Sequence, residues 1–345
     1  MQYGKFVQMP SLNNVYFSTF TLARQIVRQG YYFLNPVGFG LNPLKTTSYE
    51  IGFRQQISEN AAMDVTAFYK NIRGLVQIIN QKIDPTASIP GRYERYTNGD
   101  FATTKGMEFR LNLRRINRLS TQINYTLTQA EGTQSNSNSA QGALYFNAQM
   151  PTTINPLDYS ATHTGSINLD YRFGKKDGGL LLSQSGINLL MQFSSGHPYT
   201  HVNVNIGGQT DPYTAGIDYM QDTRDRLAAE PIGSSLTPLT FNTDLRIDKT
   251  FQIMNKELTA YVLVTNLFNR KNVVNVYEKT GSASDDGFLS NPLYSATTIA
   301  ANGGQQYIDL YKAINLENAQ AYWDNIVREI YGNPRQIFFG LKFSF

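Results

Sequence analysis

The residues from 336 to 345 alternate with a period of two between large apolar side chains and small or polar ones. One face of an extended segment would hold Ile337, Phe339, Leu341, Phe343 and Phe345. The other face would hold Gly340, Lys342 and Ser344. This pattern predicts a β-strand that needs an apolar environment on one side and a paired strand beside it. The environment is either a protein core or a lipid bilayer.

The same alternation recurs along the chain and predicts about ten strands. They cover residues 3–8, 45–57, 63–70, 93–116, 119–131, 160–173, 180–195, 239–251, 258–277 and 336–345. Short turns near Ser58, Asn117, Gly174 and Met254 alternate with long loops near Pro10, Pro85, Ser135, His197 and Asp285. Membrane barrels have short turns at the periplasmic rim and long loops outside, so this asymmetry favours an all-β, antiparallel transmembrane barrel. The alternative is a large soluble antiparallel barrel or sandwich.

Composition agrees with strands that contact a membrane. Charged residues are 16% of the chain and aromatic residues 12%, whereas charged residues make up about a quarter of ordinary soluble domains. No stretch approaches the roughly 20 apolar residues of a membrane helix. The chain has no cysteine, which excludes disulfides and thiolate metal sites. The net charge of +4 is spread without a basic block, so no nucleic-acid partner is predicted.

The polar faces of the predicted strands carry charged residues opposite the apolar stripes. The arginines among them are Arg54, Arg110, Arg172 and Arg246. A small soluble core could not hold such charges unpaired, whereas a wide hydrated or plugged lumen can. We therefore predict that these arginines face the lumen and are candidates for contact with a solute.

Aromatic residues in the predicted long loops are further candidates for solute binding. They are Tyr199, Tyr213, Tyr219, Tyr294 and Trp323. Aromatic rings beside Asn and Asp suit sugars or peptides, which offer apolar faces and hydrogen-bonding edges. The alternative for each ring is an interfacial belt or packing among the loops. Helical spacing over 307–331 predicts short helices in the last loop, where packing is the favoured role of Trp323.

No pattern in the chain predicts catalysis, a metal site or a cofactor. His197 and His201 are four residues apart, but Pro198 and the surrounding strands argue against the helix that would align them, so they are interpreted as loop histidines at the outer rim. The segment 285–287 lacks the alternating oxygen ligands of a calcium loop and is predicted to be a solvated turn. No Gly-x-Ser-x-Gly elbow is present.

Four segments together resemble the C-terminal half of a TonB-dependent outer-membrane receptor, in the style of Bacteroidetes. They are residues 45–56, 64–72, 104–109 and 264–269, followed by the aromatic strand at 336–345. The resemblance implies a plugged barrel of about 22 strands. Residues 1–345 would then be a C-terminal portion of the barrel domain, with the plug domain and signal peptide outside this chain. A self-closed barrel of about ten strands is the alternative.

The resemblance also implies a function and partners. A scarce solute of siderophore, oligosaccharide or peptide type would be imported into the periplasm with energy from the TonB–ExbB–ExbD complex, which contacts an N-terminal region absent from the chain. Outer-membrane lipid would surround the barrel, and the barrel-assembly machinery would read Phe343 and Phe345. A surface lipoprotein is a further expected partner. The alternatives are a passive porin or structural outer-membrane barrel, and a secreted all-β adhesin or enzyme.

Overall fold

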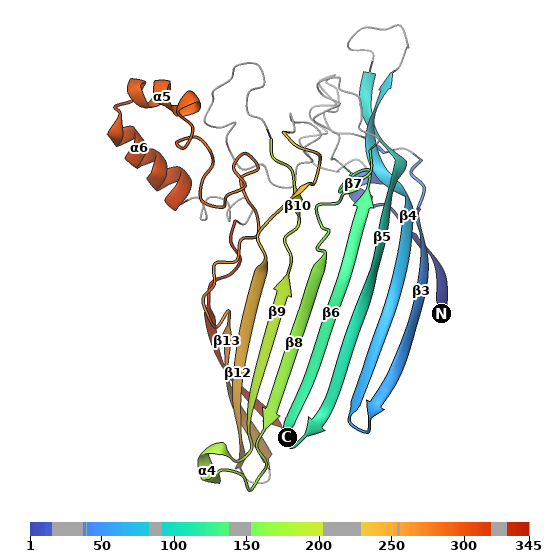
Figure 1. Cartoon of the computed structure of the whole chain (residues 1–345), viewed down its shortest axis with the longest axis vertical. Helices are drawn as coiled ribbons and strands as arrows, with labels where there is room; N and C mark the ends of the chain where they lie inside the picture. Colours follow the sequence, from blue (N-terminus) through green and yellow to red (C-terminus); the bar gives the residue numbers. More distant parts are fainter. Residues whose placement is uncertain are drawn as a thin grey trace, which may run out of the picture.

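The computed structural model describes residues 1–15, 37–38, 40–82, 92–137, 153–202, 229–253, 256–318 and 330–344. One large antiparallel sheet dominates it (Figure 1). Ten strands follow one another in chain order across this sheet: β1 (Gln2–Gln8), β3 (Leu44–Ser58), β4 (Ala61–Lys82), β5 (Arg92–Ile116), β6 (Leu119–Gly132), β8 (His163–Arg172), β9 (Ser185–Ser194), β12 (Thr240–Ile253), β13 (Lys256–Thr265) and β14 (Gln336–Ser344). The predicted antiparallel sheet of about ten long strands is confirmed.

Shorter elements lie beside the sheet and in the loops. They are α1 (Leu12–Val15), β2 (Val37–Gly38), β7 (Asn155–Pro156), α4 (Gly179–Leu182), β10 (Pro198–Tyr199), β11 (Ser235–Leu236), α5 (Pro292–Ala301), α6 (Gln305–Tyr311) and the π-helix η3 (Lys312–Glu317). β2 runs parallel to β5, β7 pairs with β6, and β10 pairs with β11. Within the described residues, no helix is both long and apolar enough to span a membrane.

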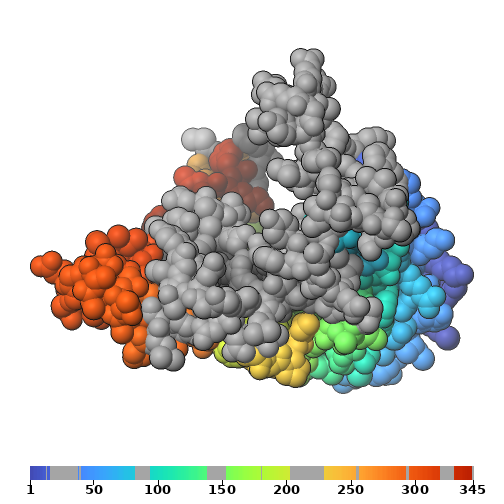
Figure 2. Space-filling model, turned by 90° about the horizontal axis from the view of Figure 1, so that it is seen from above, coloured from blue at the N-terminus to red at the C-terminus, as the bar shows by residue number. Residues whose placement is uncertain are grey.

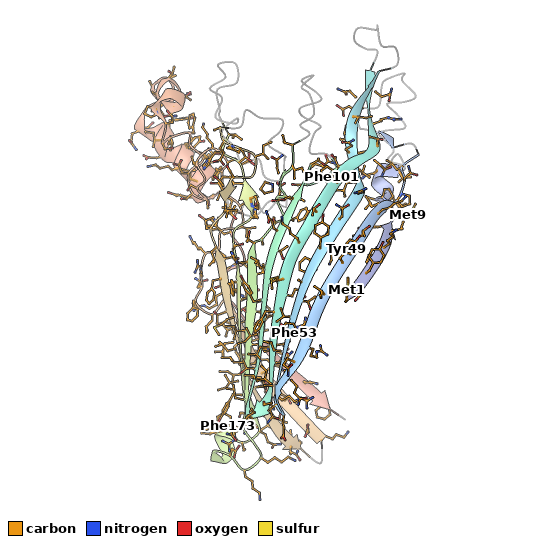
Figure 3. All side chains as sticks on the ribbon, turned by 45° about the vertical axis from the view of Figure 1, so that its right-hand side comes forward. Met1, Met9, Tyr49, Phe53, Phe101 and Phe173 are labelled. Atoms are coloured by element: carbon orange, nitrogen blue, oxygen red, sulfur yellow. The ribbon has the colours of Figure 1, made fainter. Side chains whose placement is uncertain are left out.

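The sheet is open and strongly curved. Seen from above, its strands follow an arc from the blue N-terminal edge to the red C-terminal edge (Figure 2). Among the described residues, β1 pairs along its length with β3 and β14 with β13. Met1 and Met9 mark the two ends of the edge strand β1 in Figure 3. An open edge exposes unpaired backbone groups, which lipid cannot satisfy.

The two ends of the strands differ as the sequence predicts. β5 and β6 are joined by Asn117 and Arg118, whose φ angles of 46° and 82° are those of a tight hairpin turn. At the opposite end, long segments join β6 to β8, β9 to β12 and β13 to β14. The helices α5 and α6 lie in the last of these segments (Figure 1). The prediction of helices over 307–331 holds for α6 and η3, whereas α5 lies before this range and residues 319–329 lie outside the described structure.

Three predicted strand boundaries are wrong, and two of these errors have a local reason. The strand predicted over 258–277 ends at Thr265, because Asn266 has a φ of 50° and its side-chain amide donates to the carbonyl oxygens of Arg270 and Asn333. The strand predicted over 180–195 begins only at Ser185, since residues 179–182 form α4. β4 extends the strand predicted over 63–70 as far as Lys82.

The register of the sheet separates an apolar face from a polar face. One row of residues that are paired across seven strands is apolar apart from a glycine: Phe53, Val65, Phe109, Tyr125, Gly165, Phe193 and Phe241. The neighbouring row is polar in every strand: Arg54, Asp64, Arg110, Asn124, Ser166, Gln192 and Asn242. The same pairing register aligns the apolar residues of neighbouring strands with one another and the polar residues with one another. The alternation within each strand therefore produces one continuous apolar surface and one continuous polar surface.

Buried apolar clusters lie mainly towards the long-loop end. Ala102, Ala130 and Leu157 form one cluster where β5 and β6 meet the following loop. Phe288 and Tyr311, the last residue of α6, form another in the last long segment. The apolar face of the sheet is instead solvent-exposed, with Phe339 79% exposed and Leu341 73% exposed. Such large exposed apolar surfaces mark contact with another apolar phase.

Candidate functional site

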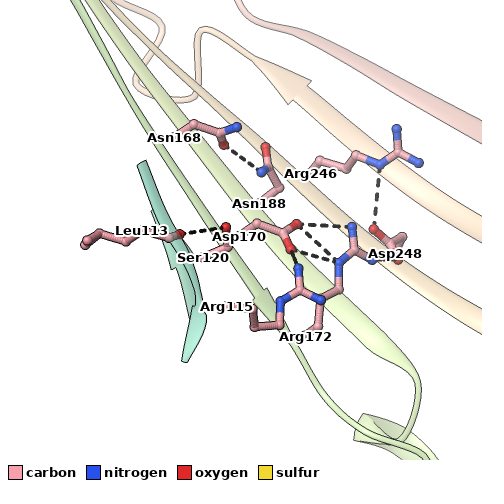
Figure 4. Close-up of polar contacts among 9 residues, drawn as sticks. All are labelled: Leu113, Arg115, Ser120, Asn168, Asp170, Arg172, Asn188, Arg246 and Asp248. Carbon is pink, nitrogen blue, oxygen red and sulfur yellow. Dashed lines mark hydrogen bonds and ion pairs between the residues drawn. The ribbon is translucent and has the colours of Figure 1, made fainter. Parts of the chain in front are cut away.

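A cluster of alternating charges lies on the polar face near the short-turn end (Figure 4). Asp170 pairs with Arg115 and Arg172, and Arg172 also pairs with Asp248 at 2.5 Å. The side chain of Asp248 is only 3% exposed, so it depends on its basic neighbours for compensation. The cluster therefore gives this part of the polar face a hydrophilic and internally paired surface.

Arg246, on β12, extends this cluster towards the C-terminal edge of the sheet. Its Nε atom lies 3.7 Å from Oδ1 of Asp248, and its guanidinium lies 4.3 Å from the centre of the Tyr261 ring. That ring crosses the neighbouring strand at Gly340, where an added Cβ would come within 2.3 Å of it. Gly340 therefore leaves room for the ring that supports Arg246.

A shallower hollow lies higher on the sheet, over β6, β8, β9 and β12. It measures about 470 Å³, and its walls include Asn124, Ser166, Gln192 and Asn242 of the polar row. Asn124 donates to Ser166 at 3.1 Å and accepts from Arg110 at 3.3 Å. These groups offer both hydrogen-bond donors and acceptors to water or to a polar solute.

A more enclosed cavity of about 420 Å³ lies at the long-loop end. Its walls come from four stretches, which are residues 132–136, 155–159, 197–200 and 274–278, with contributions from residues 232–237. Apolar side chains such as Leu157, Tyr159 and Val276 provide much of the lining, and Gln134 and Asn275 are among the polar residues. A mostly apolar cavity with a few polar groups is the common form of a small-molecule site.

Hydrogen bonds between distant loops hold this cavity open. The imidazole Nε2 of His197 lies 2.8 Å from the carbonyl oxygen of Val274. The backbone N–H of His197 donates to the hydroxyl of Thr237. The side-chain amide of Gln134 donates to the carbonyl oxygen of Val76 at 2.7 Å. Oε1 of this buried Gln134 has no hydrogen-bond partner among the described residues. It is therefore a buried acceptor whose hydrogen-bonding capacity is unused among these residues.

Glu230 fixes the β10–β11 wall of the cavity. Its carboxylate accepts hydrogen bonds from the backbone N–H of His201 at 2.8 Å and from the hydroxyl of Ser235 at 3.1 Å. Burial acts to raise the pKa of Glu230, but these hydrogen bonds outweigh it and hold that pKa below its ordinary value. Burial raises the pKa of the neighbouring Tyr199, whose hydroxyl lies 3.1 Å from Nε2 of His201.

The structure places the predicted site residues in two separate groups. Tyr199 lines the cavity, while the four arginines lie on the polar face of the sheet. Arg172 and Arg246 meet at Asp248, and Arg54 and Arg110 lie in register on either side of Asp64. Tyr294 belongs to α5, but its side chain is outside the described part of the structure. Also outside it are Tyr213, Tyr219, Trp323 and Phe345.

The remaining predictions concern single residues in the loops and at the sheet edge. His197 and His201 lie in the loop region as predicted, and no group of residues suited to hold a metal ion occurs within the described ranges. Phe343 lies on β14 with the Nζ of Lys256 5.9 Å from its ring centre. Sequence patterns missed Gln134 and Asn275, since no local signal connects loops so far apart in the chain.

The prediction of a solvated turn at 285–287 is wrong for its central residue. Asp286 is buried, and its carboxylate accepts a 2.5 Å hydrogen bond from the hydroxyl of Tyr311 and another from the backbone N–H of Phe288. Burial raises the pKa of Asp286 despite these hydrogen bonds. The segment therefore ties α6 to the preceding loop.

Comparison with known proteins identifies the family. A family model described as TonB dependent receptor-like, beta-barrel, matches residues 1–267. The chain belongs to this family, whose members are outer-membrane proteins. The polar face of the sheet is accordingly the face towards the lumen, and the apolar face is the one towards lipid. None of the curated proteins matches the chain.

Solved structures with a similar arrangement are more distant. The pyoverdine outer-membrane receptor FpvA of Pseudomonas aeruginosa PAO1 is 13% identical, with a TM-score of 0.47 over 88% of this chain and 30% of the receptor. The outer-membrane transporter YddB of Escherichia coli is 13% identical, with a TM-score of 0.48 over 71% of this chain and 32% of the transporter. The copper transporter OprC is 10% identical, with a TM-score of 0.47 over 99% of this chain and 36% of the transporter. This chain thus spans about a third of their lengths.

Proposed function

We propose that the chain forms the C-terminal portion of the barrel of an active importer in the outer membrane, in the style of the receptors of Bacteroidetes. Its barrel would be completed to about 22 strands, with a plug domain and a TonB-contacting segment encoded outside residues 1–345. A scarce solute of siderophore, oligosaccharide or peptide type would bind at the long-loop end. Energy from TonB–ExbB–ExbD would then drive its passage. We propose transport rather than catalysis.

The observation that carries this proposal is the position of the cavity relative to the polar face. The cavity lies at the long-loop end, where a solute arrives from outside, and the polar hollow over β6 to β12 lies on the lumen side. Tyr199 contributes an aromatic wall and Gln134 a buried acceptor without a partner among the described residues. A solute with apolar surface matches this aromatic wall.

We assign roles to the predicted residues within this scheme. Arg54, Arg110, Arg172 and Arg246 would line the lumen, and Tyr213, Tyr219, Tyr294 and Trp323 would join Tyr199 in solute contact. Phe343 and Phe345 would form the assembly signal for the barrel-assembly machinery. A surface lipoprotein would be a partner at the long-loop end.

The test uses the full-length protein in its own host, with uptake measured for ferric siderophores, oligosaccharides and peptides supplied separately. Tyr199→Ala removes a wall of the cavity and is expected to lower uptake of one class about tenfold at limiting concentration, since an aromatic contact contributes roughly 0.5–1.5 kcal/mol beyond its buried area. Leu236→Ala is the matched control, because Leu236 is exposed and pairs with Pro198 but does not line the cavity.

Removal of TonB distinguishes active import from passive diffusion. The proposal predicts that uptake of the same solute falls to background in a strain without TonB. Undiminished uptake in that strain would contradict it and would favour the passive porin.

A further inference from the structure

The turn between β8 and β9 differs from the other turns at its end of the sheet. Two residues separate β3 from β4, β5 from β6 and β12 from β13, but residues 173–184 separate β8 from β9 and include the one-turn helix α4. Two leucines of α4 are exposed, Leu181 by 86% and Leu182 by 46%. These adjacent exposed leucines are a candidate contact with an apolar phase, since the outer face of the same sheet is apolar.

This turn is firmly held, so the exposure of its leucines is a feature of its folded form. Asp177 accepts from the backbone N–H of Gly174 at 2.6 Å and from Arg118 at 2.7 Å. The backbone N–H of Gln184 donates to the carbonyl oxygen of Gly174 at 3.2 Å. Figure 1 shows α4 beyond the lower end of the strands.

Two side chains on the lipid side of the sheet contact the turn. Ser185 and Lys249 are in register, and each lies two residues from an isoleucine of the apolar face. The hydroxyl of Ser185 donates to the carbonyl oxygen of Leu181 at 3.2 Å, and the ammonium of Lys249 donates to Ser183. The turn is therefore fastened to side chains that point towards the bilayer.

Aromatic and basic residues lie within this turn or directly before it in the chain. The rings of Tyr171 and Phe173 meet edge to face with centroids 5.0 Å apart, and Figure 3 places Phe173 at the same end of the sheet as α4. Lys175 and Lys176 are exposed within the turn itself. Aromatic rings, leucines and lysines together are typical of segments that lie in a membrane interface, where lysines reach anionic headgroups.

We propose that residues 174–184 form an interfacial anchor. Leu181 and Leu182 insert into the periplasmic leaflet of the outer membrane, and Lys175 and Lys176 contact anionic phospholipid headgroups. The occupant is lipid because the turn continues the lipid-facing surface of the sheet and presents positive charge at its rim. This inference goes beyond solute import, since it requires only that the barrel lies in the outer membrane.

Single-cysteine fluorescence tests the anchor in the full-length protein, reconstituted in vesicles of phosphatidylethanolamine and phosphatidylglycerol. Residues 1–345 contain no cysteine, so Leu181→Cys is the single labelling position within them once any cysteine outside this range is replaced by serine. The side chain of Leu181 is exposed, so the change disturbs little packing. A label there should emit at short wavelength, be quenched by nitroxides on lipid acyl chains and resist aqueous iodide. Glu59→Cys, in the two-residue turn after β3, is the matched control and should respond only to iodide.

Substitution of the lysines tests the headgroup contact. In the Leu181→Cys background, Lys175→Gln with Lys176→Gln should reduce quenching by lipid nitroxides at least twofold in the anionic vesicles and leave it unchanged in phosphatidylcholine vesicles. Heat-dependent gel mobility confirms that each variant is folded. Iodide quenching of the Leu181 label equal to that at Glu59 would overturn the anchor, and equal quenching with and without the lysines would overturn the headgroup contact. Neither result bears on solute uptake. Failure of the anchor is therefore distinguishable from failure of the transport proposal.

Discussion

The two ends of the sheet are held together by different kinds of contact. At the short-turn end, strand register aligns Arg172, Gly186 and Asp248 on neighbouring strands. At the long-loop end, His197 contacts Val274, which is 77 positions away, and Gln134 contacts Val76, which is 58 positions away. The first end therefore follows from alternation along the chain, whereas the second depends on individual side chains that meet only in the folded protein.

The largest expected effect lies in the charge cluster at the short-turn end. Arg172→Ala leaves the buried carboxylate of Asp248 with only the more distant Arg246, and should destabilise the barrel by about 3 kcal/mol, the lower end of the range for a broken buried pair. Urea unfolding in detergent or vesicles measures this loss. The double variant Arg172→Ala with Asp248→Asn should recover most of it. If the double variant is no more stable than the single one, the cost does not come from the uncompensated charge.

A smaller effect is expected from substitutions on the two faces of β14. Leu341→Lys places a charge on the lipid face and should destabilise the folded barrel by about 2 kcal/mol, since a lysine costs roughly 2–4 kcal/mol at the bilayer midplane and less near the interfaces. The neighbouring Lys342→Leu changes a lumen-facing position and should have little effect. The heat-dependent gel mobility of the protein from isolated outer membranes measures the folded fraction of each variant. Equal loss of the folded form in the two variants would contradict the facing of β14.

The long-loop end should respond to pH in two opposite ways. The pKa of Glu230 is lowered in the folded state, so its stabilising contribution is present above its ordinary value of 4.5 and is lost as pH falls through the folded pKa. The pKa of Asp286 is raised, so its contribution is present below its ordinary value of 3.8 and is lost as pH rises through the folded pKa. Acidification should therefore loosen the β10–β11 wall and tighten the contact with α6.

Hydrogen-exchange protection factors, which correct for the intrinsic pH dependence of exchange, measure both responses. As pH falls from neutral to below the folded pKa of Glu230, protection should decrease over residues 229–236 and increase over residues 280–312. Glu230→Gln should remove the first response only, and Asp286→Asn the second only. Parallel changes in both regions would show that global unfolding, rather than these carboxyl groups, sets the dependence.

The smallest expected effect is a single hydrogen bond at the cavity wall. Tyr199→Phe removes the hydroxyl that contacts His201 and should cost about 0.5–1.5 kcal/mol of local stability. The ring that lines the cavity stays in place, so solute uptake should remain close to that of the unmodified protein. Uptake as low as in Tyr199→Ala would assign the role of Tyr199 to its hydroxyl rather than to its aromatic surface.

Sequence patterns predict the part of the fold that repeats and miss the part that does not. The alternation over 119–131 predicts β6 almost to its ends, because a half-buried strand leaves a period-two signal. The same period-two rule predicts an end of β13 that is too late, because it cannot detect the left-handed backbone of Asn266. Tyr199 is predicted from its aromatic loop context, but Gln134 has no such signal, because its hydrogen-bond partner Val76 lies 58 positions away in the chain.

The central claim is that one register creates a water-facing and a lipid-facing surface, and labelling along β6 tests it most directly. Single cysteines at each position from 121 to 128, in the full-length protein in vesicles, would carry a fluorescent label. Labels at Gln122, Asn124 and Thr126 should be quenched by aqueous iodide, whereas labels at Ile123, Tyr125 and Leu127 should be quenched by lipid nitroxides. A profile without this alternation, or with the two sets reversed, would contradict the assignment of the faces.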